Sequence, residues 1–450
     1  MAGTKWLWQS QPLNGRTGSQ VFARLGLTEP VAALLESPPG SGGRYSLCAA
    51  GRRWVALAIP HLLPWLRQHL RTDPAVTAPA EVPFAGGWWG WLAYEAVWAW
   101  ERLPPLATDP LPFPVGFWWQ PDWCAVLDHQ QDRLYLGAPD RDQLAGLRQR
   151  LHTLSEPVFP DLAPTGPVQW QLTPWEYQQR VHKVQAHIRA GDIFQANLSV
   201  RFGVPTAMHP WRVYQRLTRL NPSPFASYWQ TPWGQVVSCS PERLVQVQGE
   251  TIETRPIAGT RPRGRTPAQD AALAQELQQH PKERAEHIML VDLERNDLGR
   301  VCQAGSVRVA ELLTVERYSH VMHLVSRITG RLRPDWTMAD VFQAVFPGGT
   351  ITGCPKVRCM EILQALEPQP RNLFYGSCGY WDRRGRGDWN ILIRTLLFPA
   401  GTGMAWGQVG AGIVSDSDPE REWRECLHKA QAQLLALGVE GHEPWQEGLK

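Results

Sequence analysis

Short apolar or alternating runs, separated by turns rich in glycine and proline, recur along the whole chain and constrain its fold more than any other feature. The 450 residues include 39 glycines and 39 prolines. Runs of this kind predict strands, and the longer periodic segments between them predict helices. The two kinds do not alternate as regular strand–helix–strand units. The pattern therefore predicts an α+β fold with antiparallel sheets and not a doubly wound parallel sheet.

The composition excludes several classes of protein. Hydrophobic residues make up 43% and charged residues 19% of the chain, which is enough apolar material for a large core and excludes a disordered chain. A formal net charge of +3 provides no general attraction to nucleic acid. No apolar run reaches the roughly 18 residues of a transmembrane helix, and residues 1–23 show no signal-peptide pattern. We expect a cytoplasmic protein with reduced cysteines and with neither nucleic-acid nor membrane partners.

The first half of the chain divides into a folded segment and a connection. Residues 1–154 contain short predicted strands and end in a helix over 140–154, with Asp140 placed to cap it. Residues 155–173 contain several prolines and little periodicity, so we interpret them as a linker.

A second segment covers 174–440. It opens with Thr173, then Pro174, then Glu176, which is the sequence signature of a capped helix start. Further along, the pattern predicts one continuous strand over 389–397.

Two predicted helices carry glutamates three residues apart. One helix holds Glu283 and Glu286, and the other holds Glu422 and Glu425, with Lys429 four residues later. This spacing puts each set on one helical face. If the two helices face each other, they could hold Mg²⁺ through one or two carboxylates and several waters. The alternative is a pair of solvated faces whose ion pairs contribute about 0.3–0.5 kcal/mol each.

Three glycine-rich loops stand at 256–264, 346–356 and 407–412. Exposed backbone N–H groups at such loops favour anions. None contains the GxxxxGK[ST] order of a P-loop or a GxGxxG fingerprint after a strand. They are either plain tight turns or, together with the acidic pairs, parts of a site for a small polyanion bound through a metal.

Several segments match one family closely. They are PIAGTRPRG (256–264), KERAEHIMLVDLERNDLGRV (282–301), ERYSHVMHLVS (316–326), FPGGTITGCPKVRCMEIL (346–363), GSCGYWD (376–382), NILIRT (390–395) and GAGIVSDSDPEREWRECLHKA (410–430). In these segments the chain resembles the chorismate-utilising enzymes, which include the large subunits of anthranilate synthase and aminodeoxychorismate synthase and the isochorismate and salicylate synthases. The resemblance covers about 170–440, with a weaker match at LLES (34–37) and GRYS (43–46). It implies a large α/β sandwich of antiparallel sheets flanked by helices.

The resemblance also implies a metal site and a set of substrate contacts. Glu286 and Glu425 would bind Mg²⁺, which grips the ring carboxylate of chorismate, with Glu422 and Glu283 beside them as a further ligand or as holders of water or substrate. The remaining substrate contacts implied in this way are Arg394, Tyr380, Gly410, Ala411 and Gly412 at the enolpyruvyl carboxylate, and Lys429, Thr350, Thr260 and Ala258 around the ring.

His323 would be the general acid that protonates the departing 4-hydroxyl group. Hydroxide is a poor leaving group at neutral pH, so a proton donor with a pKa near 7 helps. We expect His287 and His320 to be structural or exposed.

Gln195 indicates which nucleophile is used. Members of the family that add water carry a lysine base at this position. Glutamine cannot deprotonate water, whereas ammonia attacks without a base. The resemblance therefore implies an aminating enzyme.

Two aminating activities stay open. QANLS (195–199), GGTITG (348–353) and GSCGY (376–380) are similar to aminodeoxychorismate synthase component 1, which we favour. Ala258 is the residue of anthranilate synthase component I, although it also occurs in some aminodeoxychorismate synthases. Both activities imply a separate glutamine amidotransferase subunit (component 2), because the chain has no GxCxG nucleophile elbow. Formation of 4-aminobenzoate would also need a separate pyridoxal-phosphate lyase.

A second pocket is implied near the N-terminus. The residues that resemble the family's tryptophan pocket are Leu35, Glu36, Ser37, Tyr45, Ser46, Asn221, Pro222, Ser223 and Pro224. They would regulate the enzyme, hold a structural tryptophan, or form plain core contacts. A non-catalytic alternative is a tryptophan- or partner-binding module with an inactive enzyme behind it; the complete set of expected catalytic residues argues against it.

Overall fold

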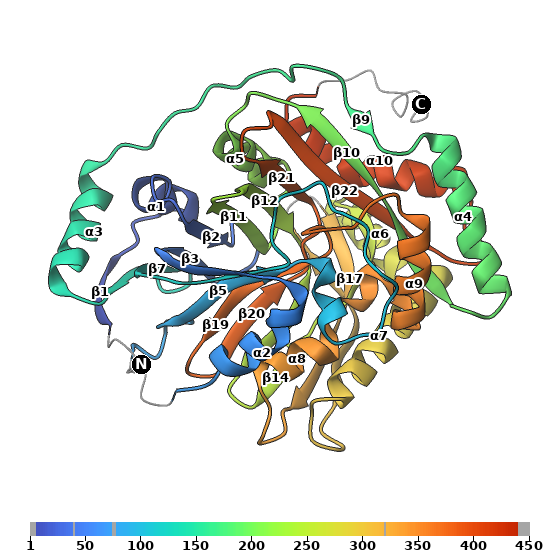
Figure 1. The fold of residues 1–450 in the computed structure, drawn as a ribbon, viewed down its shortest axis with the longest axis horizontal. Helices are drawn as coiled ribbons and strands as arrows, with labels where there is room; N and C mark the ends of the chain where they lie inside the picture. The colour runs from blue at the N-terminus through green and yellow to red at the C-terminus, as the bar shows by residue number, and fades with distance from the viewer. Residues whose placement is uncertain (1–5, 39–40, 74–77, 319–320, 440–450) are drawn as a thin grey trace.

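The computed structural model describes residues 6–38, 41–73, 78–318 and 321–439, and its centre is a pair of large antiparallel β-sheets (Figure 1). His320 and residue 440, the expected last residue of the second segment, lie outside the described residues. Helices cover the outer faces of the two sheets (Figure 1). The predicted α+β sandwich of antiparallel sheets flanked by helices is therefore confirmed.

Within the described residues the first sheet has twelve strands. In spatial order they are β1 (Leu7–Pro12), β8 (Arg133–Ala138), β7 (Trp123–Asp128), β3 (Tyr45–Ala50), β2 (Ala32–Glu36), β11 (Phe225–Thr231), β12 (Gly234–Ser240), β21 (Thr395–Pro399), β22 (Met404–Ile413), β10 (Gln195–Pro205) and β18 (Gly353–Cys354), with β9 (Gln169–Trp170) on β10.

The second sheet has ten strands among the same residues. In spatial order they are β15 (Ile257–Pro262), β17 (Val321–Arg331), β14 (Thr251–Thr254), β13 (Arg243–Gln248), β20 (Arg386–Asn390), β19 (Ser377–Asp382), β5 (Gly87–Leu92), β6 (Gly116–Gln120) and β4 (Arg53–Leu57), with β16 (Arg308–Arg317) on β17.

The helices divide between two large hydrophobic cores and one small one. Those that pack on the outer face of the twelve-stranded sheet are α1 (Gly18–Leu25), α3 (Arg141–Thr153), α4 (Pro174–Arg189), α5 (Pro210–Leu220), α9 (Lys356–Leu366) and α10 (Pro419–Ala436). The others are α2 (Ile59–His69), α6 (Pro267–Gln279), α7 (Pro281–Gly299), α8 (Met338–Val345) and the 3₁₀ turns η1 (Tyr94–Ala99) and η2 (Gly349–Ile351). Of these, α6 belongs to the small core. In the ranges that the structure describes, no helix is long and apolar enough to span a membrane.

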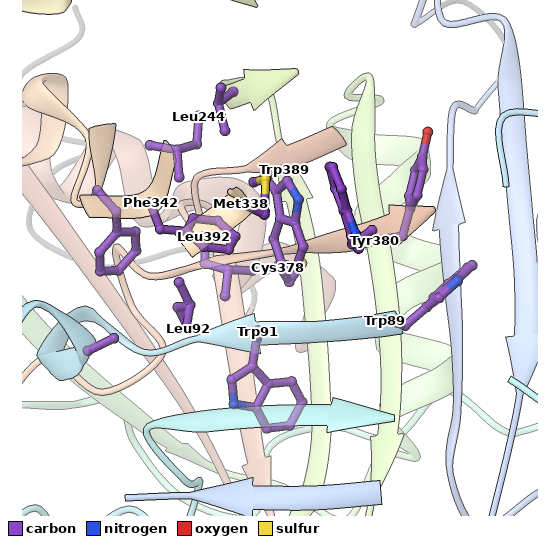
Figure 2. Close-up of a cluster of buried hydrophobic side chains, with 14 of the residues drawn as sticks. Trp89, Trp91, Leu92, Leu244, Met338, Phe342, Cys378, Tyr380, Trp389 and Leu392 are labelled. Carbon is purple, nitrogen blue, oxygen red and sulfur yellow. The ribbon is translucent and has the colours of Figure 1, made fainter. Parts of the chain in front are cut away.

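Large aromatic side chains fill the core of the ten-stranded sheet. Figure 2 shows Trp89 and Trp91 on β5 and Trp389 on β20; the Trp389 ring packs against Phe342 of α8 with ring centres 5.0 Å apart. The glycines between these tryptophans permit close strand pairing: a Cβ at Gly90 would overlap the carbonyl oxygen of Phe117 on β6.

Local sequence signals set the helix starts. Asp140 caps α3 by accepting a hydrogen bond from the Gln143 N–H at 2.8 Å. Thr173 forms a capping box with Glu176 at the start of α4. Both predictions are confirmed, because a cap depends on residues within one helical turn.

The predicted strand over 389–397 is wrong, and the error matters for the site. The chain leaves the ten-stranded sheet after β20, crosses at residues 391–394, and enters the twelve-stranded sheet as β21. A second crossing runs from β12 to β13 at residues 241–242. Hydrogen bonds join the two crossings: the Ser240 hydroxyl donates to the Ile391 carbonyl at 2.6 Å, and the Ile391 N–H donates to the Glu242 carbonyl at 3.0 Å.

Both sequence segments contribute strands to both sheets. In the first sheet β2 of the N-terminal segment pairs with β11 of the second segment, and in the second sheet β5 pairs with β19. The linker region 155–173 contains β9 and runs from α3 to α4 along the outside of the molecule (Figure 1). The predicted division into segments 1–154 and 174–440 therefore stays a prediction.

Candidate active site

The two strand crossings lie side by side; one carries Glu242 and the other carries Arg394. The Cys239 N–H donates to the Arg394 carbonyl at 3.1 Å. Arg394 has a φ of +52°, a left-handed conformation that turns the chain between the two sheets. Its guanidinium Nη1 donates to the Lys429 carbonyl of α10 at 2.6 Å, so the arginine is fixed against the second acidic helix.

Tyr375 is the tyrosine at this corner. Its hydroxyl would be 2.9 Å from a Cβ on Gly410. Burial lowers the pKa of the nearby Arg394 guanidinium, and Tyr375 opposes that effect. The Tyr375 hydroxyl is buried and makes no hydrogen bond with the described residues. The expectation for Tyr380 is corrected: its ring packs on Phe84 and lines a different cavity between the sheets.

Gln195 and Glu286 meet over Gly412 of β22, and Gly410 of the same strand lies under Asn197. The Gln195 amide Nε2 donates to Glu286 Oε1 at 2.7 Å. A Cβ at Gly412 would lie 2.5 Å from that nitrogen and 3.3 Å from Glu286 Oε1. A Cβ at Gly410 would lie 2.6 Å from Asn197 Oδ1. The glycines are therefore needed so that β10 and α7 can bring polar side chains onto this face of β22. Ala411 between them is buried toward the opposite core.

Replacing Gly412 with alanine should reduce kcat/KM by more than about 10-fold, because the methyl group displaces Gln195 and Glu286. The backbone of Gly412 is not in the left-handed region, so the fold should be retained. Steady-state kinetics and circular dichroism measure the two effects. Gly146→Ala is the matched control: that glycine lies in α3 with open space around it, and alanine there should stabilise the protein by about 0.5–1 kcal/mol with unchanged kinetics. Equal kinetics for the two variants would contradict the arrangement.

Lys429 connects α10 to the same strand. Its ammonium Nζ donates to the Gly410 carbonyl at 2.9 Å and forms an ion pair with Glu425 at 2.6 Å. Glu425 is half exposed. Glu422 is buried on the same helix, and its charge adds to the effect of burial in raising the pKa of the Tyr177 hydroxyl and of the Cys426 thiol. Glu286 thus lies beside Gly412, and Glu425 is connected to Gly410 through Lys429.

His323 lies on β17 opposite Thr260 of β15. Its Nδ1 is 3.0 Å from Thr260 Oγ1 and 3.4 Å from the Gly259 carbonyl oxygen. Burial, together with a smaller effect of the Arg394 charge, lowers the pKa of His323 to about 4. The imidazole is therefore neutral at pH 7 in the free protein, which differs from the expected pKa near 7. Ala258 is buried on β15 opposite Leu324.

Glu283 is held by an arginine of the first glycine loop. Arg261 donates to Glu283 Oε1 at 2.8 Å, and a Cβ on Gly259 would overlap the other oxygen, Oε2. That oxygen is buried and makes no hydrogen bond with the described residues. Glu283 therefore presents one carboxylate oxygen toward the loop that carries Thr260.

Glu242 is a functional candidate that the sequence analysis missed. Its side chain is 5% exposed, and the Thr350 hydroxyl faces its carboxyl without completing a hydrogen bond of good geometry. Burial raises the pKa of Glu242 to about 7, against a smaller opposite effect of Thr350. A carboxyl group that holds a proton near pH 7 beside the expected substrate contact Thr350 can act as a general acid. In the sequence, Glu242 is a single glutamate after a predicted buried strand. No second acidic residue stands three or four positions away, so spacing could not single it out.

The candidate metal ligands are two carboxylate groups, one on each of two helices. Carboxylate oxygens are the donors that Mg²⁺ prefers, and Glu286 and Glu425 supply them from two helices. In the part of the chain that the structure describes, no three His, Cys, Asp or Glu side chains converge as a ready-made cage. If Mg²⁺ is bound here, Glu286 and Glu425 would hold it and water or substrate would complete its coordination.

His287 is structural, as expected. It is fully buried, and its Nε2 is 2.6 Å from the Ser326 hydroxyl. Burial lowers the pKa of His287 to about 4.

A cavity of about 910 Å³ lies between the two sheets, at some of the residues expected for a tryptophan pocket. Those that line it are Leu35, Glu36, Ser37, Tyr45 and Pro224. Asn221, Pro222 and Ser223 lie in the turn after α5 and do not line it, and Ser46 is buried behind it, bonded to the Ser37 N–H. The Glu36 carboxylate accepts hydrogen bonds from Ser19 and Tyr214, so it belongs to the wall of the cavity.

Known proteins resemble this chain over most of its length. The family described as chorismate binding enzyme matches residues 43–435. An anthranilate synthase component I-like protein of Synechocystis sp. is 52% identical over 96% of this chain and 92% of its own length. Aminodeoxychorismate synthase component 1 of Bacillus subtilis is 44% identical over 80% of this chain and 78% of its own length.

A solved structure shows the same architecture. The crystal structure of anthranilate synthase component I from Streptococcus pneumoniae superposes with a TM-score of 0.77 at 30% identity, over 89% of this chain and 93% of that chain. Sequence and structure comparisons agree, and the chain belongs to the family of chorismate binding enzymes.

Proposed function

We propose that this chain is component 1 of an aminodeoxychorismate synthase. It would replace the 4-hydroxyl group of chorismate with an amino group and form 4-amino-4-deoxychorismate, the precursor of 4-aminobenzoate and folate. Ammonia would come from a glutamine amidotransferase subunit, component 2. The observation that carries this proposal is the contact between the Gln195 amide and Glu286 at the substrate face of β22.

The contact bears on the nucleophile. An amide has no basic nitrogen at neutral pH, and Gln195 Nε2 is engaged as a donor to Glu286, so Gln195 itself cannot remove a proton from water. Ammonia is nucleophilic without prior loss of a proton. A C–N bond forms on the ring, the C–O bond breaks, and the hydroxyl group leaves as water after it takes a proton. The ring-bound ammonium then releases one proton to solvent, so the step balances.

The other residues would bind the substrate and supply that proton. Arg394 and Tyr375 stand at the corner where the enolpyruvyl carboxylate would bind. Glu242 and His323 are the two candidates for the proton donor. Mg²⁺ held by Glu286 and Glu425 would withdraw electrons from the ring carboxylate.

A second function, anthranilate synthase component I, is favoured by two observations. Ala258 is the residue expected of that enzyme, and the Synechocystis relative carries the name anthranilate synthase component I-like protein. Anthranilate and pyruvate would then be the products.

Product analysis distinguishes the two functions. The purified chain is incubated with chorismate, an ammonium salt and Mg²⁺, and the mixture is divided and treated with or without a lyase that forms 4-aminobenzoate. We expect 4-aminobenzoate only in the treated half. Anthranilate in both halves would establish the second function, and unconsumed chorismate would favour the non-catalytic binding module.

Glu425→Ala should abolish Mg²⁺-dependent turnover, because it removes one of the two carboxylates proposed to bind the metal. Chorismate consumption is measured over a range of Mg²⁺ concentrations. Glu420→Ala is the matched control: Glu420 lies on the same helix but is exposed and paired with Arg424. Undiminished Mg²⁺-dependent activity in Glu425→Ala would reject the metal role.

A further inference from the structure

Two side-chain amides, those of Gln195 and Asn197, stand two residues apart on β10. Because side chains alternate along a strand, both lie on one face of the sheet. That face also carries the glycines of β22: Gln195 Nε2 would lie 2.5 Å from a Cβ on Gly412, and Asn197 Oδ1 would lie 2.6 Å from a Cβ on Gly410. The two amides therefore border the same part of the candidate active site.

Each amide is held through its nitrogen. Gln195 Nε2 donates to Glu286 Oε1 at 2.7 Å, and Asn197 Nδ2 donates to the Thr350 carbonyl at 3.3 Å. A backbone carbonyl can only accept a hydrogen bond, so the Asn197 nitrogen faces Thr350 and the oxygen faces Gly410. These contacts fix which end of the Asn197 amide points into the site.

The backbone of Asn197 is also held on both sides. Its N–H donates to the Thr352 carbonyl at 2.9 Å, and its carbonyl accepts a hydrogen bond from the Arg371 guanidinium at 2.7 Å. The same guanidinium donates to the Ile351 carbonyl at 2.8 Å. β10 and the loop that carries Thr350 are therefore joined around Asn197, and its amide is ordered before any ligand binds.

The oxygens of the two amides lack partners among the described residues. Gln195 Oε1 and Asn197 Oδ1 are both buried and accept no hydrogen bond there. A buried acceptor without a donor is costly. The Asn197 oxygen, whose direction is fixed, is therefore suited to a ligand that offers N–H or O–H donors.

Of the two proposed substrates, ammonia matches this chemistry better. The carboxylates of chorismate are acceptors, which an amide oxygen repels, and its single hydroxyl group offers one donor. Ammonia offers three N–H donors and has one lone pair. An acceptor that holds an N–H group leaves the lone pair free for the ring, and an amide cannot protonate it. The proposed function also places the nucleophile at Gln195, and Asn197 is the next residue along the same face.

We propose that Asn197 binds the incoming ammonia by accepting an N–H hydrogen bond at Oδ1. The inference rests on the proposed function, because it says how this chain holds the ammonia that the reaction consumes. Asn197 forms and breaks no covalent bond and transfers no proton. It orients the nucleophile, whose nitrogen then attacks the ring.

The test is the dependence of turnover on ammonia for Asn197→Leu and Asn197→Val in the full-length chain, with chorismate and Mg²⁺ saturating and the pH constant. Leucine is close to asparagine in size, valine suits a strand, and neither has an acceptor. We expect the KM for NH₃ to rise about 10-fold, which is the usual effect of one hydrogen bond. Because binding is lost equally from the ground state and the transition state, kcat at saturating ammonia should stay within about twofold of wild type, as should the KM for chorismate.

Asn296→Leu is the matched control, since Asn296 is exposed on α7 and the change in chemistry is the same. It should leave all three constants unchanged, and circular dichroism checks the fold of each variant. If Asn197 only supported the Thr350 loop, or if Oδ1 bound the 4-hydroxyl group, the KM for chorismate would rise instead. Either result, or an unchanged KM for NH₃ in both Asn197 variants, would overturn the proposal.

The proposed function is judged separately, from the product of the wild type. Anthranilate as the product would reject the aminodeoxychorismate synthase activity, while the KM values for NH₃ would still decide the role of Asn197. A wild type that consumes no chorismate with ammonium salts would overturn both.

Discussion

His323→Ala should lower kcat by about 10²- to 10⁴-fold while the KM for chorismate changes only a few fold. The imidazole is held at Nδ1 by Thr260 and the Gly259 carbonyl, which aims the other nitrogen away from β15. An interaction made mainly in the transition state affects kcat more than substrate binding. Steady-state kinetics with saturating ammonium salts measure both constants.

The pH dependence separates His323 from Glu242 as proton donor. Burial lowers the pKa of His323 to about 4 in the free protein, whereas that of Glu242 is raised to about 7. If His323 donates the proton, the carboxylates of the bound substrate must raise its pKa, and Glu242→Gln should retain the alkaline limb of kcat. If Glu242 donates it, that limb disappears in Glu242→Gln. An unchanged kcat in His323→Ala would remove the histidine from the mechanism.

Arg371→Met should destabilise the protein by about 3–5 kcal/mol, because it leaves a buried carboxylate without its partner. Arg371 and Glu367 are almost fully buried and form a two-point ion pair, with both N···O distances at 2.7–2.8 Å. The same guanidinium donates to the Asn197 carbonyl at 2.7 Å and lies 4.7 Å from the centre of the Tyr375 ring. Urea unfolding followed by circular dichroism measures the loss in free energy of unfolding. We also expect kcat to fall, because Arg371 contacts both Asn197 of β10 and the Tyr375 ring.

The control for Arg371 is an exposed pair of the same chemistry. Arg424 pairs with Glu420 on α10, and both side chains are more than half exposed. Arg424→Met should change stability by less than about 0.5 kcal/mol, since water solvates either charge. Similar losses in the two variants would mean that burial is not the source of the effect.

Sequence patterns predicted the features that depend on short-range chemistry. Asp140 and Thr173 cap their helices because the donors they satisfy lie within three residues. The antiparallel α+β architecture followed from strand runs without regular crossover helices. The spacing of Glu283 with Glu286 and of Glu422 with Glu425 placed each set on its helix but could not show what each helix faces.

Features that depend on distant pairing were missed. The run over 389–397 is mostly apolar, with no glycine or proline to mark a break, so the predicted strand was extended across the crossing at Arg394. The alternation of side chains along a strand does not predict which tyrosine lies at Gly410. It is Tyr375, before the strand, and not Tyr380 within it. Glu242 has no partner at a fixed spacing, and only burial between the two crossings gives it a proton near pH 7.

The interleaving of strands has a consequence for dividing this polypeptide. A cut between residues 154 and 174 would separate β2 from β11 and β5 from β19, and each fragment would carry open sheet edges with unpaired N–H and C=O groups. Such fragments would self-associate unless they were produced together. The two halves are therefore folding partners of one another, and co-expression is the only setting in which either should reach its native form.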